Sequence, residues 1–281
     1  MTEDTPFKAA AIQMNSGGDV PGNLALADDL LERASAAGVR LAVLPENFAL
    51  MPRRAREKTA IAESPGEGPI QDFLADAAAR YRLWIVAGSM PLRSPDPERT
   101  FGACIVVDDT GTRRDIYRKI HLFDVDLADS EESYRESRSM YPGDDPVVVK
   151  SPFGVIGLTI CYDLRFPELF RSLVDADASI FTVPSAFTAT TGRAHWHPLL
   201  RARAIENLGY VIAPGQSGMH ADGRATYGHS LIVDPWGKIL AEVEEGNGIA
   251  TAEIEPQRVA TLRRDFPALQ NRRLAHISSS R

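Results

Sequence analysis

The 281-residue sequence has few cysteines and no excess of positive charge. Its two cysteines, Cys104 and Cys161, can form at most one disulfide, which excludes a disulfide-stapled scaffold and favours reduced thiols in the cytoplasm. Asp and Glu number 38 against 31 Lys and Arg, which gives a net charge of −7. Nucleic-acid-binding proteins usually carry a basic surplus or stripe, so the acidic balance argues against a nucleic-acid partner.

Long apolar runs and targeting signals are also missing. The longest uncharged and rather apolar stretch, residues 178–192, carries Ser, Thr and Pro throughout and is not expected to span a membrane. Residues 1–5 are acidic and lack the basic and apolar regions of a signal peptide. With 44% hydrophobic and 25% charged residues, the composition is that of a soluble globular protein.

Phosphate-binding and metal-binding motifs are absent. No G-x-x-x-x-G-K-[ST] occurs, and no H-E-x-x-H or C-x-x-C. His195 and His197 lie two positions apart near a predicted helix start, but no third ligand is near them in the sequence, so helix capping or loop structure is favoured over zinc. The acidic segment 124–126 lacks the Gly and Glu of a calcium loop. The sequence therefore predicts no metal site.

Apolar periodicity predicts an α/β protein. Strand-like runs alternate with helical stripes in the first third of the chain, and the same alternation returns after residue 160. Turn residues elsewhere join strands into antiparallel hairpins. The expected strands are 7–13, 41–44, 83–87, 179–183, 210–213 and 249–253, the hairpins 103–119, 146–160 and 230–243, and the helices 23–37, 69–81, 167–174, 197–207 and 258–266.

Asn23 is expected to cap the first helix, and Gly88 to end the strand 83–87. Residues 121–145 are polar and aperiodic, which predicts a long loop of functional importance. No linker, repeat or low-complexity tract divides the chain. We therefore expect a single domain over residues 1–281, with a core of about 7–266 and a C-terminal tail, 267–281.

Cys161 ends an apolar strand and is followed by a sharp turn into a helix. A thiol at such a place points out of the sheet edge near a helix N-terminus, where backbone N–H groups and the helix dipole favour a thiolate. Position alone leaves the choice open between a nucleophile and a small buried residue. Cys104, in the middle of a strand, is expected to belong to the core.

Three charged residues lie at comparable places. Glu46 directly follows the buried strand 41–44, where α/β sheets place catalytic groups, and apolar neighbours would raise its pKa toward that of a general base. Lys119 ends a strand and would hold a positive charge against an oxyanion. Glu136 lies inside the long loop. Taken singly, each of the three is explained better by capping or by exposure to solvent.

Together these segments resemble the nitrilase (carbon–nitrogen hydrolase) superfamily, whose signature is a Glu–Lys–Cys triad on three strand ends. LPENF resembles its glutamate motif, YRKIHLFD its lysine motif and CYDLRFPE its nucleophile motif, in the family's order. The resemblance continues through PSAFTATTGRAHWHPLLRARAIEN and YGHSLIVDPWG, and covers about residues 7 to 275. It implies an αββα four-layer sandwich, homodimers or higher homo-oligomers paired around the helix after the nucleophile, and no metal or organic cofactor.

The resemblance also implies roles in amide hydrolysis. Cys161 would be the nucleophile and would form a thioester, Glu46 the general base, and Lys119 with the backbone N–H after Cys161 the oxyanion donors. Glu136 matches the second glutamate of the family, which would orient Lys119 or the substrate. Arg165 and Arg193 are candidates for binding a substrate carboxylate; the alternatives are an ion pair of Arg165 with Glu168 or another acid, and solvent exposure of Arg193. Tyr162, Phe187 and His195 are expected to shape the pocket, with core packing as the alternative.

The predicted substrate is a small ω-amide that carries a carboxylate and is hydrolysed to an acid plus ammonia. TGRAHWHPLLRARAIE resembles the amidase branch that contains deaminated-glutathione amidase and omega-amidase. RESRSMYPGDD favours the former, whereas KIHLFDVD fits omega-amidase, which acts on α-ketoglutaramate or α-ketosuccinamate, equally well. A nitrilase, an N-carbamoyl hydrolase and a non-catalytic binding protein with the same fold remain alternatives.

Overall fold

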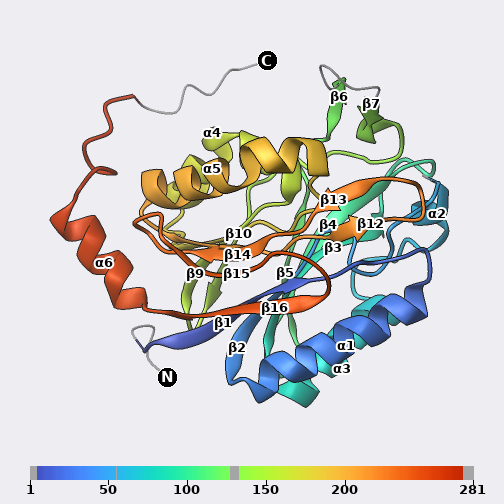
Figure 1. Cartoon of the computed structure of the whole chain (residues 1–281), viewed down its shortest axis with the longest axis horizontal. Helices are drawn as coiled ribbons and strands as arrows, with labels where there is room; N and C mark the ends of the chain where they lie inside the picture. Colours follow the sequence, from blue (N-terminus) through green and yellow to red (C-terminus); the bar gives the residue numbers. More distant parts are fainter. Residues whose placement is uncertain (1–4, 55, 127–132, 275–281) are drawn as a thin grey trace.

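The computed structural model describes residues 5–54, 56–126 and 133–274. In this part of the chain, two six-stranded sheets pack face to face between two pairs of helices (Figure 1). Helices α1 (Val20–Ala36) and α3 (Pro69–Tyr81) cover the first sheet, and α4 (Pro167–Asp175) and α5 (Ala189–Asn207) cover the second. The four layers confirm the predicted αββα sandwich.

Both sheets have a parallel centre and antiparallel edges. In the first, β1, β2 and β3 are parallel neighbours, and in the second β9, β10 and β11 are. The first sheet has the order β16 (Gly248–Ile254), β1 (Phe7–Gln13), β2 (Val39–Leu44), β3 (Trp84–Arg93), β4 (Thr100–Val107) and β5 (Arg113–Arg118). The second has the order β15 (Ile239–Val243), β14 (Ser230–Val233), β11 (Tyr210–Ala213), β10 (Ile180–Thr182), β9 (Gly154–Leu158) and β8 (Val148–Ser151).

Successive side chains of the central strands point to opposite faces of the sheet, as the two-residue period of a strand requires. In β1, Ala9 and Ala11 face the second sheet, whereas Ala10 and Ile12 pack with Leu30 of α1. Both faces of the strand are therefore buried. This explains why β1 reads as a continuous apolar run rather than as an alternating one.

Shorter elements complete the described chain. The largest is α6 (Pro256–Asp265), and a short helix, α2 (Arg56–Ala60), follows β2. Two small ribbons pair β6 (Asp124–Asp126) with β7 (Ser133–Arg135) and β12 (Ser217–Met219) with β13 (Ala225–Tyr227), and two 3₁₀ turns are η1 (Glu136–Arg138) and η2 (Cys161–Arg165). Every helix in this part of the chain is too short or too polar to cross a lipid bilayer.

Several predicted boundaries were wrong. Helix α1 begins at Val20, capped by Asp19, whose carboxylate accepts the Gly22 N–H; Asn23 is buried inside the helix, and its amide donates to the carbonyls of Gly17 and Ala49. The predicted loop 121–145 contains β6, β7 and η1, and its residues 127–132 lie outside the described residues, as do residues 275–281 of the predicted tail.

Two elements extend furthest beyond their predicted bounds. Strand β3 continues through Gly88 to Arg93, because Gly88 has no side chain and passes close to the end of β2: a Cβ there would lie 2.0 Å from the Pro45 carbonyl oxygen. Helix α5 begins at Ala189 rather than at residue 197. The Thr188 hydroxyl accepts the Thr191 N–H and caps it, and Pro198 is accommodated inside the helix.

Candidate active site

Glu46, Lys119 and Cys161 meet in one cluster, although they come from different sheets. Glu46 follows β2 and Lys119 follows β5 in the first sheet, whereas Cys161 follows β9 in the second. Lys119 Nζ donates to Glu46 Oε1 at 2.8 Å, and the negative charge of the Glu46 carboxylate acts on the neighbouring Cys161 thiol. The carboxylate therefore lies between an ammonium and a thiol.

Glu136 completes this cluster from the turn η1. Lys119 Nζ lies 3.0 Å from each of its carboxylate oxygens, and the backbone N–H of Phe123 donates to its Oε2 at 2.7 Å. The buried lysine thus has two carboxylate partners, Glu46 and Glu136. Removing a single partner would still leave the ammonium paired.

Hydrogen bonds from two other segments hold Glu46 in place. Its Oε2 accepts the Ala186 N–H at 2.8 Å, and the Gln216 side-chain amide donates to the Glu46 carbonyl at 3.0 Å. Both partners belong to segments that leave the second sheet, after β10 and β11. The close approach of Gly88 holds the chain before Glu46 from the other side.

The electrostatics of the cluster differ from the expectation for Glu46. Burial raises the pKa of this carboxyl, but the charge and hydrogen bond of Lys119 and the charge of Lys58 together outweigh it, so the pKa lies below its ordinary value. Burial lowers the pKa of Lys119, but Glu136 and Glu46 raise it well above its usual range. Glu46 and Lys119 are therefore an ion pair in the free protein, and the prediction of a raised Glu46 pKa was wrong.

Cys161 is a thiol rather than a thiolate. Burial, followed by the negative charge of Glu46, raises its pKa well above the ordinary value, and the opposing charge of Lys119 does not compensate. The sequence also predicted that a helix N-terminus would stabilise the thiolate. Cys161 instead opens the short 3₁₀ turn η2, and α4 begins only at Pro167. Cys104 is fully buried in β4, as predicted, and burial raises its pKa strongly.

The backbone at Cys161 has a φ of +50°, in the left-handed region that few non-glycine residues occupy. Its N–H donates to the Pro184 carbonyl at 2.9 Å. Asp163, two residues on and fully buried, accepts the Ile160 N–H at 2.8 Å, the His121 N–H at 3.1 Å and the Tyr117 hydroxyl at 2.7 Å. These bonds hold a conformation that would otherwise be unfavourable.

The cluster lies in a pocket of about 240 Å³ whose lining includes several basic and aromatic side chains. The overall chain is acidic, yet basic side chains in the lining outnumber acidic ones by six to three. A pocket of this charge suits an anionic ligand. The basic residues are Arg53, Lys58, Lys119, Arg135, Arg165 and Arg224, and the acidic ones Glu46, Glu136 and Asp222.

Lys58 is a lining residue that the sequence analysis missed. It is 9% exposed, and its Nζ donates to the Met140 sulfur at 3.7 Å; within the described residues no carboxylate lies within ion-pair distance of it. Burial lowers its pKa. An unpaired ammonium beside the catalytic cluster is available for a substrate anion. Its place in a short helix after an arginine-rich segment gave no sign of this.

The predicted binding residues divide into two groups. Tyr162, Phe187 and Arg165 line the pocket, and the Arg165 guanidinium lies 5.2 Å from the Phe187 ring centre and 5.9 Å from that of Tyr162. Arg193 and His195 are exposed on α5 outside the lining, although His195 Nδ1 lies 3.3 Å from Arg165 Nη1. A role for these two in binding stays a prediction.

Comparison with known proteins gives consistent matches. The family described as carbon–nitrogen hydrolase matches residues 8–264. A protein of Synechocystis sp. named deaminated glutathione amidase is 42% identical over 273 residues, which cover 95% of this chain and 98% of that one.

Solved structures with the same fold match almost the whole chain. The NitFhit protein of C. elegans superposes with a TM-score of 0.90 at 35% identity, covering 97% of this chain and 66% of that longer protein. Nit3 of Saccharomyces cerevisiae, described as a member of branch 10 of the nitrilase superfamily, superposes with a TM-score of 0.86 at 32% identity, covering 96% and 97% of the two chains.

Proposed function

The chain belongs to the carbon–nitrogen hydrolase family, and we propose that it hydrolyses deaminated glutathione through a thioester on Cys161. The observation that carries this proposal is the grouping of Cys161 with the hydrogen-bonded pair Glu46 and Lys119 in the lining of one pocket. The relatives named deaminated glutathione amidase support the choice of substrate.

In the first step, Glu46 accepts the thiol proton as Cys161 Sγ attacks the amide carbonyl carbon. The lowered pKa of Glu46 and the raised pKa of Cys161 leave a carboxylate and a thiol in the free protein, which are the starting states of this step. The carbonyl oxygen becomes an oxyanion, which Lys119 Nζ and the backbone N–H of Tyr162 stabilise; loss of one such donor costs about 10²- to 10³-fold in rate. Glu136 keeps Lys119 charged and oriented.

In the second step, Glu46 returns the proton to the amide nitrogen, the C–N bond breaks and the amine leaves. A water molecule, deprotonated by Glu46, then attacks the thioester and releases the acid with Cys161 as a thiol. In every step Glu46 accepts or returns a proton, which is the pattern of nucleophilic catalysis with an adjacent base.

The leaving amine distinguishes the two amidase alternatives. Deaminated glutathione has no terminal amide: its oxo-acyl group is joined to the nitrogen of cysteinylglycine, so the amine released is that dipeptide and not the ammonia that the sequence analysis predicted. α-Ketoglutaramate delivers the same acyl group to Cys161 but releases ammonia. The shared product is 2-oxoglutarate. The part of the pocket that binds the acyl group would therefore bind the same group in both reactions.

We assign the carboxylate of this acyl group to Lys58. The ammonium is buried beside Glu46 and Glu136, both of which exert their charge on it, and it has only a thioether as hydrogen-bond partner among the described residues. Arg165, packed between Phe187 and Tyr162, is proposed to bind the more distant carboxylate of a longer substrate.

The test compares deaminated glutathione with α-ketoglutaramate for the wild-type protein and Cys161→Ala, following 2-oxoglutarate together with the released amine. A higher kcat/KM for deaminated glutathione, with cysteinylglycine as co-product and no turnover by the variant, is expected. Preference for α-ketoglutaramate would move the assignment to omega-amidase. A panel of nitriles and N-carbamoyl amino acids tests those alternatives, and failure on every amide would favour a binding protein.

We also propose that the protein is a cytoplasmic homodimer. The nucleophile must remain a free thiol, which a reducing compartment ensures, and both cysteines are unpaired in the structure. Ile205, Trp236 and Phe266 expose apolar side chains, and the last two rings contact each other. These residues lie at the end of α5 and beside it, and they are the surface that a second copy would bury. Light scattering of wild type and Trp236→Glu tests this, with a monomeric variant expected.

A further inference from the structure

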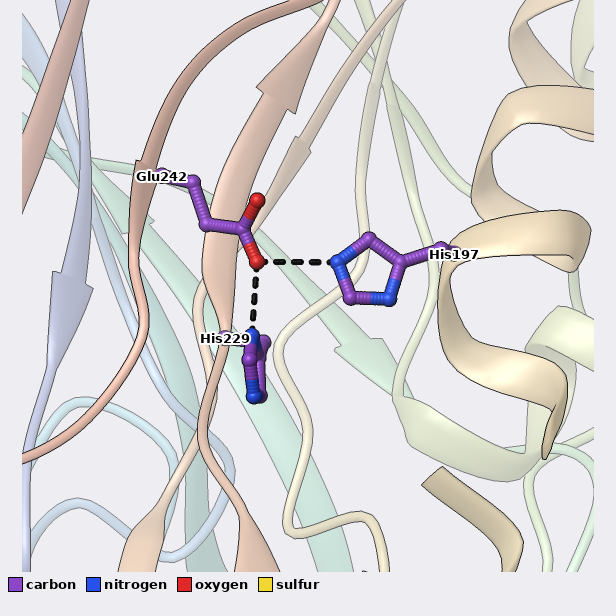
Figure 2. A group of neighbouring side chains, drawn as sticks. All are labelled: His197, His229 and Glu242. Atoms are coloured by element: carbon purple, nitrogen blue, oxygen red, sulfur yellow. Dashed lines mark hydrogen bonds and ion pairs between the residues drawn. The ribbon is translucent and has the colours of Figure 1, made fainter. Parts of the chain in front are cut away.

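Three side chains of metal-ligating type converge outside the active-site pocket. His197 comes from α5, His229 from the residue before β14, and Glu242 from β15 (Figure 2). Glu242 Oε1 lies 2.8 Å from His197 Nε2 and 2.7 Å from His229 Nδ1, and one ligand atom of each residue lies within 4.8 Å of the others. None of the three residues lines the active-site pocket.

The arrangement is close to a coordination geometry. Tetrahedral zinc with ligands at about 2.0–2.2 Å holds neighbouring ligand atoms roughly 3.3 Å apart. The two nitrogen–oxygen distances of the cluster would therefore widen by only about half an ångström. The side chains of His197, His229 and Glu242 are 28%, 23% and 24% exposed, so a hydrated cation can reach them and keep water in its remaining positions.

The three groups are held by the fold around them. The Trp196 indole N–H donates to the His229 carbonyl at 2.8 Å, and the Tyr227 ring stacks on the His229 imidazole with ring centres 4.2 Å apart. Glu242 is fixed by ladder pairing of its strand with Leu231. Such outer contacts orient imidazole and carboxylate ligands in metal sites.

The charge of the cluster also suits a cation. One carboxylate oxygen of Glu242 lies within hydrogen-bond distance of both imidazoles. No Lys or Arg of the described residues pairs with it. Two imidazoles and one carboxylate form a donor set that borderline divalent metals such as zinc bind in proteins.

We propose that His197, His229 and Glu242 bind a divalent transition metal ion, with zinc as the representative probe. The ion would tie α5 to the hairpin of β14 and β15. Thr188 and Thr191 at the start of α5, and Thr226 in β13, belong to the pocket wall, so the ion would brace that wall from behind. Its role is structural, and the inference does not depend on which amide the pocket accepts.

Calorimetric titration of the full-length Cys161→Ala protein with zinc tests the site, because this background removes the active-site thiol as a competing ligand. We expect one zinc ion per chain and a raised melting temperature. His197→Gln and Glu242→Gln keep hydrogen-bonding groups and should each weaken zinc binding by at least about 10-fold. His195→Gln, which removes a neighbouring exposed histidine outside the cluster, should bind zinc as tightly as its parent.

Crystals of the wild-type protein grown with zinc provide a readout that does not depend on the variants. An anomalous peak between His197, His229 and Glu242 is expected. Zinc affinity that is unchanged in both cluster variants, or an anomalous peak only at Cys161 or elsewhere, would overturn the proposal.

Discussion

The Tyr117 hydroxyl donates to a carboxylate oxygen of Asp163 at 2.7 Å, and this buried bond joins the two sheets at the catalytic cluster. Tyr117 lies two residues before Lys119, and Asp163 lies two residues after Cys161. The bond therefore fixes the position of Lys119, the proposed oxyanion donor, relative to Cys161, the proposed nucleophile. Asp163 is a positioning residue, because it acts on Cys161 and Lys119 only through neighbouring residues of the chain.

Tyr117→Phe removes this bond and retains the ring. We expect a loss of about 1–3 kcal/mol in the free energy of unfolding, because a buried acceptor loses one of its donors. Activity should fall through kcat with little change in KM, since no contact with substrate is altered. Steady-state kinetics and urea unfolding measure both effects. A changed KM with normal kcat would argue against the positioning role.

Glu46→Gln should have opposite effects on two readouts. The charge of Glu46 raises the pKa of Cys161, so its removal should lower that pKa and speed alkylation by iodoacetamide at pH 8. Amide hydrolysis should nevertheless be abolished, because the general base is gone. Alkylation that slows in the variant would contradict the assigned charge states.

The acid limb of the pH profile should lie at unusually low pH. Because the pKa of Glu46 is below its ordinary value, the carboxylate stays ionised through neutral and mildly acidic solution and is protonated only as the pH falls below about 4.5. Protonation of Glu46 should therefore cause no change in kcat/KM between about pH 5 and 7. An acid limb near pH 6.5 in the wild-type profile would contradict the lowered pKa of Glu46.

Lys58→Met tests carboxylate recognition. A charge-assisted hydrogen bond contributes about 1.5–3 kcal/mol, so kcat/KM for α-ketoglutaramate should fall by roughly 10- to 100-fold. Hydrolysis of 4-oxopentanamide, in which a methyl group replaces the carboxylate, should hardly change. Arg53→Met, which removes an exposed charge from the same pocket, serves as the matched control. Equal losses on both amides would assign Lys58 to structure rather than to binding.

Gly88→Ala should destabilise the protein and displace Glu46. A Cβ at this position would lie 2.0 Å from the Pro45 carbonyl oxygen and 2.2 Å from that of Leu44, both backbone atoms that cannot move alone. We expect a loss of several kcal/mol, of the order seen for severe overpacking. Gly17→Ala is the control, because nothing lies within 4 Å of a Cβ there. Similar melting temperatures for the two variants would contradict this.

The sequence predicted those features that depend on local pattern. The buried runs before Glu46, Lys119 and Cys161 placed each residue at a strand end, and their match to three family motifs brought them into one site. The geometry supports the roles of these residues, but those roles remain predictions until the variants are measured. The single-domain organisation over residues 1–281 is likewise still a prediction.

Other features depend on contacts that no short window contains. The lowered pKa of Glu46 is caused by Lys119, 73 residues away in the sequence, and by Lys58, 12 residues away, rather than by its apolar neighbours. Lys58 enters the pocket from a five-residue helix with no periodic signal. His197 acquires its carboxylate neighbour from 45 residues away. In each case tertiary packing determines the chemical environment.

The catalytic cluster spans both sheets, with Glu46 and Lys119 on one and Cys161 on the other. The distance between the Cys161 thiol and the Glu46 carboxylate therefore depends on how the two sheets pack against each other. Any loosening that lets the sheets slide or separate by an ångström would stop the chemistry while each sheet kept its own hydrogen bonds. Catalytic activity should consequently be lost on warming before the far-ultraviolet circular dichroism signal changes.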